Sequence, residues 1–473
     1  MIATVQRGLL WIMLLAGGLG LFGCRGGGEG QGRTPVPTGT PTLAATPTVE
    51  AKLIEDNKTL NVLLVAHPTS EIIKRHIGEF EAVSANAVRV EIGSYYDVHQ
   101  KQLLDLGAGT SRYDVMMVID TWLPEFAVSG NILELQKQIK KLDDEGEYGW
   151  MSDIIPNVNV LLAQWQGKQV ALPVMASSQL LMYRKDLFEE QRKAFSVFAK
   201  RDLTVPRTWE EFNQVARFFT KATNPYSPTE YGVSVAAQAG NSALCLFQTI
   251  LWGVGGREFG KGWRVTVNNQ QGLKAMTLWA EQAQYAPPEA ATMYWDEMNK
   301  MFRQGQAAMQ IQWDAFATQV EEAPDTQVRG KVGYALVPGQ PNPAPVIGGW
   351  VLVINKNSKK APLAWDFIKW CCGPEFGRTL NQEGGQLPRL SLYTDPELIA
   401  QHPWYDIARQ SLEKAQQRTS FTPGGPTLPS QTQYESILGG EANAAFTVQK
   451  SPEEAVNDAA DKLGKMLEAI GRR

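Results

Sequence analysis

Cysteine and histidine are scarce in this chain of 473 residues, with only four of each. The cysteines show no C-x-x-C spacing, and adjacent residues such as Cys371 and Cys372 point about 100° apart on a helix, which disfavours a disulfide between them. The histidines lack the H-E-x-x-H spacing of a zinc site. We therefore expect Cys245, Cys371 and Cys372 to be buried thiols, and we expect no metal site and no cofactor.

The motifs of common hydrolytic and nucleotide-binding sites are also absent. The chain has no Walker A sequence and no G-x-S-x-G nucleophile elbow, and the nearest string, GNSAL at 240–244, lacks the final glycine. Acidic pairs such as Asp143-Asp144 and Glu321-Glu322 could serve as glycosidase carboxylates, but a solvated helix face is the commoner role for such pairs. These absences favour a binding protein over an enzyme.

Strong charge imbalance and a second long apolar run are missing as well. The net charge is −4, with both signs mixed along the chain and no basic block, which argues against nucleic acid as a partner. No long apolar run follows residue 23, so the sequence predicts no second passage through a membrane. Tryptophan, by contrast, is abundant at 14 residues, and this abundance prompts a search for aromatic binding surfaces.

The N-terminus has the layout of an export signal. Arg7 precedes an uncharged stretch at 8–23, which is shorter than the roughly 20 residues that span a membrane. The stretch ends in LFGC at 21–24, which resembles the Leu-x-Gly-Cys lipobox of bacterial lipoproteins. That resemblance implies a signal peptide over 1–23 and a lipid on Cys24. The alternative is an uncleaved N-terminal anchor; both place the bulk of the chain outside the cytoplasm at a membrane surface.

The segment after the cysteine has the composition of a linker. Residues 25–50, RGGGEGQGRTPVPTGTPTLAATPTVE, are rich in glycine, threonine and proline and nearly devoid of large apolar side chains. Such a segment cannot bury enough surface to offset the entropy lost on ordering. We expect a tether over 24–58 between the anchor and the folded body.

Strand-like and helix-like patterns alternate beyond the tether. LNVLLVAHP at 60–68 has the composition of a buried strand, and 70–84 has apolar residues at helical spacing. Thr208 with Glu211 forms a capping box at the start of a helix over 208–223. The alternation predicts an α/β protein with a parallel sheet covered by helices on both faces. More than 400 residues are too many for one core, so two lobes are expected.

Several stretches carry a family resemblance. GKQVALPVMASSQLLMYRKDLFEE at 167–190, VPRTWEEF at 205–212, FRQGQAAMQIQWDAF at 302–316, IGGWVLVINK at 347–356 and EGGQLPRL at 383–390 follow one another like the landmarks of a single family. They resemble the extracellular solute-binding proteins of ABC importers, in the carbohydrate-binding group that includes maltose-binding protein.

The resemblance implies a two-lobed periplasmic-binding-protein-like fold with hinge crossings, a ligand in the cleft between the lobes and closure of the lobes around it. The family order implies a first lobe at 59–180 plus 340–388 and a second lobe at 181–339 plus 389–473. A lipid on Cys24 would keep a ligand-capturing body close to a membrane permease.

Ligand-binding side chains are expected where strands end, because open α/β lobes bind ligands at the carboxyl ends of their strands. Sugars require aromatic faces for their C–H groups and polar side chains for their hydroxyls. The candidates at such positions are Asp120, Trp122, Ser177, Ser178, Gln238, Asn241, Gly349 and Trp350. The structural alternatives are a helix cap for Asp120 or Asn241, a helix-face or core position for Trp122 or Trp350, and a plain hinge loop for Ser177 and Ser178.

Trp313 and Asp314 directly follow the strand pattern AAMQIQ, where the resembled family often places a stacking aromatic. The alternation puts Met309 and Ile311 on one face, and Trp313 continues that side as the strand ends. A core position is the alternative for Trp313, and Asp314 could accept two hydrogen bonds from hydroxyls of one sugar. The remaining candidates are His67, Tyr434 and Arg389, the last of which either pairs with an acid or clamps a ligand.

We therefore expect a lipid-anchored extracytoplasmic protein that captures a sugar or oligosaccharide for an ABC importer and has no enzymatic activity. Its partners would be the carbohydrate, the permease subunits and the membrane that holds its lipid, and we expect a monomer. Two alternatives stay open: a secreted carbohydrate-active enzyme, and the same fold with another small polar solute as ligand.

Overall fold

The computed structural model of the protein describes residues 58–144, 149–418 and 431–471. The predicted signal peptide, Cys24 and the tether up to residue 57 lie outside the described residues. Among the described residues, no helix combines the length and the apolar character that crossing a membrane requires.

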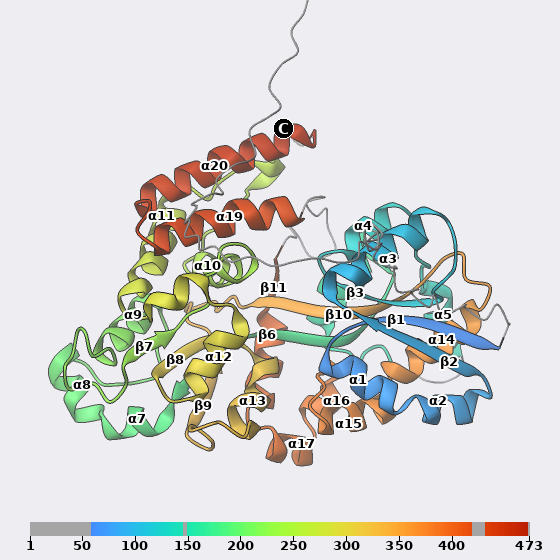
Figure 1. Cartoon of the computed structure of the whole chain (residues 1–473), viewed down its shortest axis with the longest axis horizontal. Coiled ribbons are helices and arrows are strands. Elements are labelled where there is room, and N and C mark those ends of the chain that lie inside the picture. The colour runs from blue at the N-terminus through green and yellow to red at the C-terminus, as the bar shows by residue number, and fades with distance from the viewer. Residues whose placement is uncertain (1–57, 145–148, 419–430, 472–473) are drawn as a thin grey trace, which may run out of the picture. The chain divides into compact units, whose positions relative to one another are not determined.

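A nine-stranded mixed sheet runs through the described body (Figure 1). Its main path follows the order β2-β1-β3-β10-β6-β8-β7, while β11 pairs with β10 and β9 pairs with β6. The strands are β1 (Thr59–Val65), β2 (Ala87–Gly93), β3 (Val115–Ile119), β6 (Leu172–Arg184), β7 (Tyr231–Ser234), β8 (Ala307–Trp313), β9 (Val332–Leu336), β10 (Val346–Ile354) and β11 (Gln416–Gln417), and a separate hairpin contains β4 (Gln164–Trp165) and β5 (Lys168–Gln169).

Helices connect the strands throughout. Before β6 these are α1 (Pro68–Arg75), α2 (Ile77–Ser84), α3 (Tyr95–Gly107), α4 (Leu123–Val128), α5 (Gln136–Asp144) and α6 (Pro156–Ala163). Between β6 and β10 they are α7 (Lys185–Glu190), α8 (Arg192–Ala199), α9 (Trp209–Phe218), α10 (Asn241–Gly253), α11 (Gln270–Glu281), α12 (Trp295–Arg303) and α13 (Ala317–Glu322). After β10 they are α14 (Ala361–Cys371), α15 (Pro374–Gln382), α16 (Leu390–Tyr393), α17 (Pro396–Gln401), α18 (Tyr405–Lys414), α19 (Gln431–Phe446) and α20 (Pro452–Ala469).

The direction of the strands differs in part from the prediction. β1 pairs in parallel with β2 and β3, and β7 with β8, as expected for strands linked by helices. β10, however, is antiparallel to β3 and β6, and β6 is antiparallel to β8 and β9. The predicted parallel sheet is therefore confirmed for β1, β2 and β3, and it does not extend to β6 and β10. A crossover helix imposes the parallel direction on strands that follow each other, and β6 and β10 arrive from distant parts of the chain without that constraint.

Local side-chain hydrogen bonds set the limits of α9. Thr208 caps the helix by accepting a hydrogen bond from the Glu211 N–H at 3.2 Å, as predicted, whereas the Glu211 carboxylate accepts from the Arg207 N–H at 2.7 Å. The helix ends at Phe218, earlier than expected. Just beyond this end, the Thr220 hydroxyl donates to the Ala216 carbonyl at 2.7 Å, a local bond that competes with the continuation of a helix.

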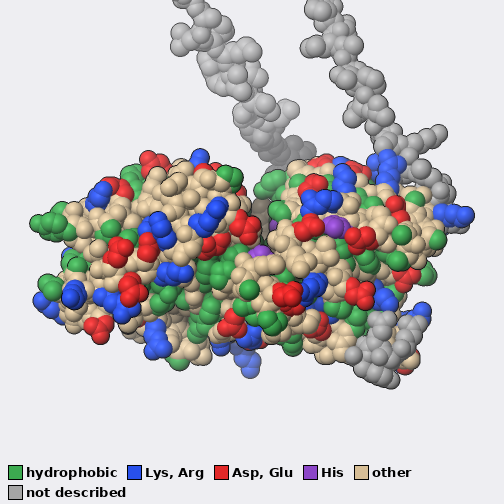
Figure 2. All heavy atoms as spheres, turned by 90° about the horizontal axis from the view of Figure 1, so that it is seen from below, with side chains coloured by type: hydrophobic (Ala, Val, Ile, Leu, Met, Phe, Trp, Pro, Cys, Tyr) green, Lys and Arg blue, Asp and Glu red, His purple; other side chains and the backbone are tan. Residues whose placement is uncertain are grey.

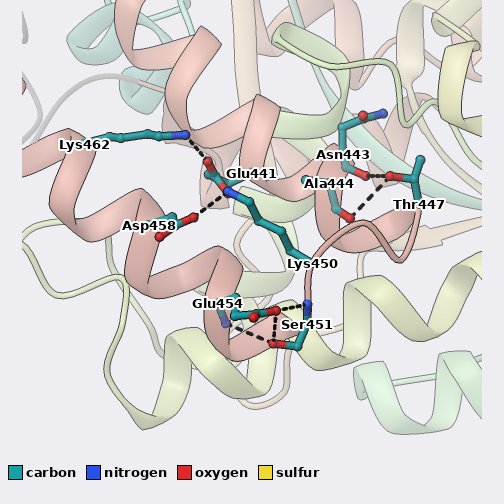
Figure 3. A network of polar contacts seen from close by, with 9 residues as sticks. All are labelled: Glu441, Asn443, Ala444, Thr447, Lys450, Ser451, Glu454, Asp458 and Lys462. Atoms are coloured by element: carbon teal, nitrogen blue, oxygen red, sulfur yellow. Dashed lines mark hydrogen bonds and ion pairs between the residues drawn. The ribbon is translucent and has the colours of Figure 1, made fainter.

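The C-terminal helices α19 and α20 are joined by a cap and a buried carboxylate (Figure 3). The Glu454 N–H donates to the Ser451 hydroxyl at 3.2 Å, and the Ser451 N–H donates to the Glu454 carboxylate at 2.9 Å. Glu441 on α19 is 3% exposed and is ion-paired with both Lys450 and Lys462. Ser451 thereby caps α20, and the Lys462 pair fixes α20 against α19.

Two hydrophobic cores lie on the two sides of the sheet's midpoint. The first core is drawn mainly from residues between 60 and 182 and between 347 and 415. The second core is drawn mainly from residues between 181 and 298, between 308 and 346 and between 434 and 467. The lobe boundaries given above stay a prediction, because side chains near the midpoint can pack into either core.

Strand β6 joins the two cores without a break. Its residues Leu172 to Ser178 pair with β10, and its residues Gln179 to Tyr183 pair with β8. The change of partner falls between Ser178 and Gln179, where Ile347 of β10 and Trp313 of β8 are their respective neighbours. Strand ends from both cores therefore meet at this midpoint.

Candidate ligand-binding site

The end of β3 brings Asp120 beside Arg418, the residue that follows β11. The Asp120 N–H donates to the Gly349 carbonyl at 3.1 Å, and Asp120 Oδ1 accepts from Arg418 Nη2 at 2.7 Å. Asp120 is 1% exposed and Arg418 6%. Asp120 Oδ2 and Arg418 Nε are buried and have no hydrogen-bond partner among the described residues. The pair is removed from water and retains one unsatisfied acceptor and one unsatisfied donor.

The charges of this pair depend on each other. Burial lowers the pKa of the Arg418 guanidinium, but the Asp120 carboxylate, with smaller contributions from Cys245, Glu435 and Tyr95, holds the pKa of Arg418 above its ordinary value. Burial raises the pKa of Asp120, and Arg418 opposes that shift. Arg418 therefore carries its positive charge, and Asp120 is the carboxylate that compensates it.

Aromatic side chains of the first core meet next to this pair. The ring centroid of Trp122 lies 4.3 Å from that of Tyr95 and 6.2 Å from that of Trp350, and Tyr95 and Trp350 are 6.0 Å apart. His99 stacks on Trp122 at 4.1 Å. Trp122 and Trp350 are each 8% exposed. Both rings are thus held by packing, and each keeps a small accessible area.

A tryptophan of the second core approaches the same place. Trp313 ends β8 and packs edge-on against Trp295, with 5.6 Å between their centroids. A Cβ atom added at Gly348 would lie 3.4 Å from the Trp313 ring and 3.6 Å from Arg418 Nη2. The Trp313 ring, Gly348 on β10 and the Arg418 guanidinium are therefore neighbours. Of the predicted residues, Asp120 and Trp313 are neighbours of Arg418, and Gly349 accepts from the Asp120 N–H. Trp122 and Trp350 follow Asp120 and Gly349 closely in the chain and lie 6.2 Å apart.

Ser177, Ser178 and Asp314 form a second group at the point where β6 changes partner. The Ser177 hydroxyl and the Ser178 N–H, the latter at 3.0 Å, both donate to Asp314 Oδ1. All three residues are buried. Burial raises the pKa of Asp314 to about 7, although these two hydrogen bonds oppose the shift. In this arrangement Asp314 Oδ1 binds the crossing strand itself.

Gln238 and Asn241 lie before and at the start of α10. Gln238 is exposed, and its side-chain amide is 3.4 Å from the Thr292 carbonyl. Asn241 donates through Nδ2 to Glu435 on α19 at 3.0 Å. Gly240 rather than Asn241 occupies the N-cap of α10, so the capping alternative for Asn241 is wrong.

Arg389 lies apart from the Arg418 group and is engaged by the protein. It is 1% exposed, and Nη1 donates to Asp153 at 3.0 Å and to the Trp150 carbonyl at 2.9 Å. Its Nε donates to the Cys372 carbonyl at 2.6 Å, and the guanidinium lies 4.2 Å from the Trp150 ring centroid. Of the two roles considered for Arg389, the geometry matches the pairing with an acid.

Tyr434 and His67 also bond within the protein. Tyr434 is 1% exposed, and its hydroxyl donates to Glu258 at 3.0 Å and accepts from Gln248 at 2.8 Å. His67 caps α1, and its Nδ1 accepts from the Thr69 N–H at 3.2 Å. Burial lowers the pKa of His67 to about 4, so its imidazole is neutral at pH 7.

The expected buried thiols are confirmed, since Cys245, Cys371 and Cys372 are free and buried. Within the described ranges, no group of three or more histidine, cysteine, aspartate or glutamate side chains is arranged to hold a metal ion.

Sequence reasoning missed Arg418 and Tyr95. Tyr95 lies two residues after β2, so the rule applied to the other strand ends would have found it. Arg418 follows a strand of only two residues, which has no recognisable pattern of its own. Pairing with Val346 and Ile347 of β10 creates this strand, and such a pairing cannot be read from local sequence.

Comparison with known proteins assigns this chain to a family. The model of the family described as bacterial extracellular solute-binding protein matches residues 66–377. A probable amino-acid ABC transporter periplasmic-binding protein of Sinorhizobium fredii is 23% identical over 397 residues, which cover 83% of this chain and 85% of that protein. A mannitol-binding protein of Pseudomonas aeruginosa is 23% identical over 339 residues, covering 68% of this chain and 74% of that protein.

Solved structures share the fold. An ABC transporter solute-binding protein of Agrobacterium radiobacter in complex with ribitol is 26% identical, with a TM-score of 0.72 over 87% of this chain and 99% of that one. The maltose-bound MalE3 of T. maritima is 22% identical, with a TM-score of 0.69 over 86% of this chain and 100% of that one. The two-lobed fold expected from the sequence is confirmed by these neighbours.

A first prediction concerns Arg389. Replacing it (Arg389→Met) leaves the Asp153 carboxylate and two backbone carbonyls without their buried donor, so the free energy of unfolding should fall by about 3–5 kcal/mol in urea titrations. The control is Arg378→Met, because Arg378 pairs with Asp395 and Glu397 near the surface and should matter far less. Unchanged stability of the Arg389 variant would contradict the structural role.

A second prediction concerns the pH dependence contributed by Asp314. Its pKa is raised in the fold from 3.8 to about 7, so the native state retains a proton that the unfolded chain has released between these values. Stability should therefore fall as pH rises through this window, by up to about 1.4 kcal/mol per pH unit. The difference in unfolding free energy between wild type and Asp314→Asn, measured in urea from pH 4.5 to 8, isolates this contribution. A difference that does not change with pH would refute it.

Proposed function

The chain belongs to the bacterial extracellular solute-binding proteins, and from this premise we propose that it captures a sugar or sugar alcohol between its two lobes for delivery to an ABC importer. We further propose that it does so without chemical conversion of the ligand, as a monomer held to the membrane by a lipid on Cys24.

The main support for this proposal is that tryptophan side chains lie close to the buried Asp120–Arg418 ion pair. Trp313 of the second core lies near Arg418 across Gly348. Trp122 and Trp350 of the first core pack on each other, two residues after Asp120 and one residue after its partner Gly349. Tryptophan faces suit the C–H surfaces of a polyhydroxyl compound, whose hydroxyls both donate and accept hydrogen bonds. The Asp120 carboxylate compensates the Arg418 charge, which suits a neutral ligand better than an anion.

The names of relatives and structural neighbours agree with this ligand class. They include a mannitol-binding protein, an erythritol/L-threitol-binding protein of Mycolicibacterium smegmatis and a complex with D-mannitol, all of which concern neutral polyhydroxyl compounds. On the face shown in Figure 2, lysine, arginine and acidic side chains are interspersed.

An amino acid is the second candidate ligand. Asp120 Oδ2 could accept from an ammonium group, and Arg418 Nε could donate to a carboxylate, since both atoms are buried and lack partners among the described residues. The relative from Sinorhizobium fredii is named for amino-acid transport. An amino acid would occupy the same site, but unlike a sugar it would carry a positive and a negative charge.

A third prediction tests the ligand class and Trp313 together. A thermal-shift screen of the purified protein should select sugars or alditols over amino acids, with about 2.7 kcal/mol of stabilisation at a hundredfold excess over Kd. With the selected ligand, calorimetry should find Trp313→Ala weaker by about 1–3 kcal/mol through loss of stacking. Selection of amino acids alone would replace the proposal by the second candidate.

The matched control for Trp313 is Trp365→Ala. Trp365 on α14 is 7% exposed, close to the 8% of Trp313, and belongs to the first core. The Trp365→Ala variant should have a lower free energy of unfolding than the wild type and the same affinity for the ligand. Equal affinities of wild type and Trp313→Ala would remove Trp313 from the site, and conversion of the recovered ligand would indicate an enzyme.

A fourth prediction tests the anchor. In a bacterial host, the wild-type chain should sediment with membranes, whereas Cys24→Ser should be released because no thiol is left to carry the lipid. Cys245→Ser is the control, since this buried thiol has no part in anchoring. Membrane attachment of the Cys24 variant, detected by immunoblotting of fractions, would favour an uncleaved anchor.

A further inference from the structure

Arg418 is bound by elements of both cores. The strand before it, β11, pairs with β10 at Val346 and Ile347. Its carbonyl accepts a hydrogen bond from Gln248 Nε2 on α10 at 2.9 Å, while its guanidinium donates to Asp120 at the end of β3. β11 thus pairs at the border of the two cores, because Val346 belongs to the second core and Ile347 to the first. The Arg418 carbonyl is attached to the second core through Gln248, and its side chain is attached to the first core through Asp120.

The attachment to the second core is rigid because Gln248 belongs to a buried polar network. Its Nε2 lies 2.7 Å from Glu258 Oε1 and 2.8 Å from the Tyr434 hydroxyl. The other carboxylate oxygen of Glu258 accepts from Trp252 Nε1 at 2.9 Å. Gln248, Glu258 and Tyr434 are each 6% exposed or less. Because water does not compete for these bonds, Gln248 is held in place, and so is the Arg418 carbonyl that it binds.

The attachment to the first core is equally constrained. The Asp120 N–H is bonded to Gly349, so the carboxylate cannot follow the guanidinium if the cores move apart. The Arg418 side chain is 6% exposed and that of Asp120 is 0% exposed. Removing one member of a buried pair leaves an uncompensated charge in low dielectric, which strongly disfavours the arrangement that buries it.

We propose that Arg418 is a positioning residue for ligand capture: its ion pair with Asp120 bridges the two lobes and favours their closed arrangement. The inference rests on the proposed capture of a ligand between the lobes. A ligand that binds the closed arrangement then gains affinity in proportion to the closed fraction. The ion pair thus influences the affinity for the ligand by shifting the equilibrium between the open and closed arrangements of the lobes.

The test measures the distance between the lobes without ligand in the full chain. Spin labels on Val83→Cys in α2 and Tyr226→Cys before β7 suit this purpose, because these positions are 80% and 92% exposed. The native Cys245, Cys371 and Cys372 are buried, and Cys24→Ser removes the fourth native thiol. Double electron–electron resonance then measures the distance distribution between the labels, from which the populations of the open and closed arrangements follow. No ligand is needed, so the result does not depend on whether the ligand is a sugar.

Arg418→Met should raise the ratio of open to closed lobes at least about tenfold, equivalent to about 1.4 kcal/mol. Arg418→Lys, which keeps the charge, should open the lobes less. The double variant Asp120→Asn/Arg418→Met should also open them less than Arg418→Met, because no unpaired carboxylate stays buried. Distance distributions of Arg418→Met that match wild type, or equal opening by the single and double variants, would overturn the proposal.

The matched control is Arg184→Met. Arg184 pairs with Asp186 at 2.6 Å and its side chain is 11% exposed, but both residues lie at the junction of β6 and α7 in one lobe. This variant should leave the distance distribution unchanged, and urea titrations should show that all variants are folded. With the ligand found by screening, Arg418→Met should lose affinity by the same factor as its closed fraction falls. A much larger loss would make Arg418 a direct ligand contact instead.

Discussion

The continuity of β6 is the constraint on which the rest of this structure depends. One strand pairs with β10 on the side of the first core and with β8 and β9 on the side of the second. Backbone hydrogen bonds on both sides fix the place where the partner changes, at Ser178 and Gln179. Each core can pack independently around its own segment of the strand, and residues from both cores meet where the segments join.

Burial of polar groups at this junction follows from that arrangement. Asp314 stands directly after β8, and its carboxyl binds Ser177 and Ser178 of the crossing strand instead of water. Asp120 stands directly after β3 and is compensated by Arg418. A buried polar or charged group is tolerated only with partners, so each of these carboxyls is held by contacts made across the junction. The same contacts align the two cores.

The functional proposal follows from chemistry at the junction together with family membership. The family model covers residues 66–377, while the relatives and structures named above are between 21% and 26% identical to this chain. Such similarity defines the fold and the class of protein, and leaves the ligand to the side chains at the strand ends. Here those side chains are tryptophans from both cores around a compensated ion pair, a combination suited to a neutral polyhydroxyl compound.

The sequence by itself determined the alternation of strands and helices, the Thr208 cap of α9 and the Ser451 cap of α20, because these depend on neighbours a few residues apart. It also directed attention to strand ends, where Asp120, Trp122, Trp350 and Trp313 indeed gather. Only the tertiary structure decided that Asp314 and Arg389 bind the protein's own backbone and carboxylates. Only tertiary structure brought Arg418 to Asp120, 298 residues away in the chain. The antiparallel entry of β10 beside β3 and β6 creates those contacts, and pairing between distant strands has no local signature in sequence.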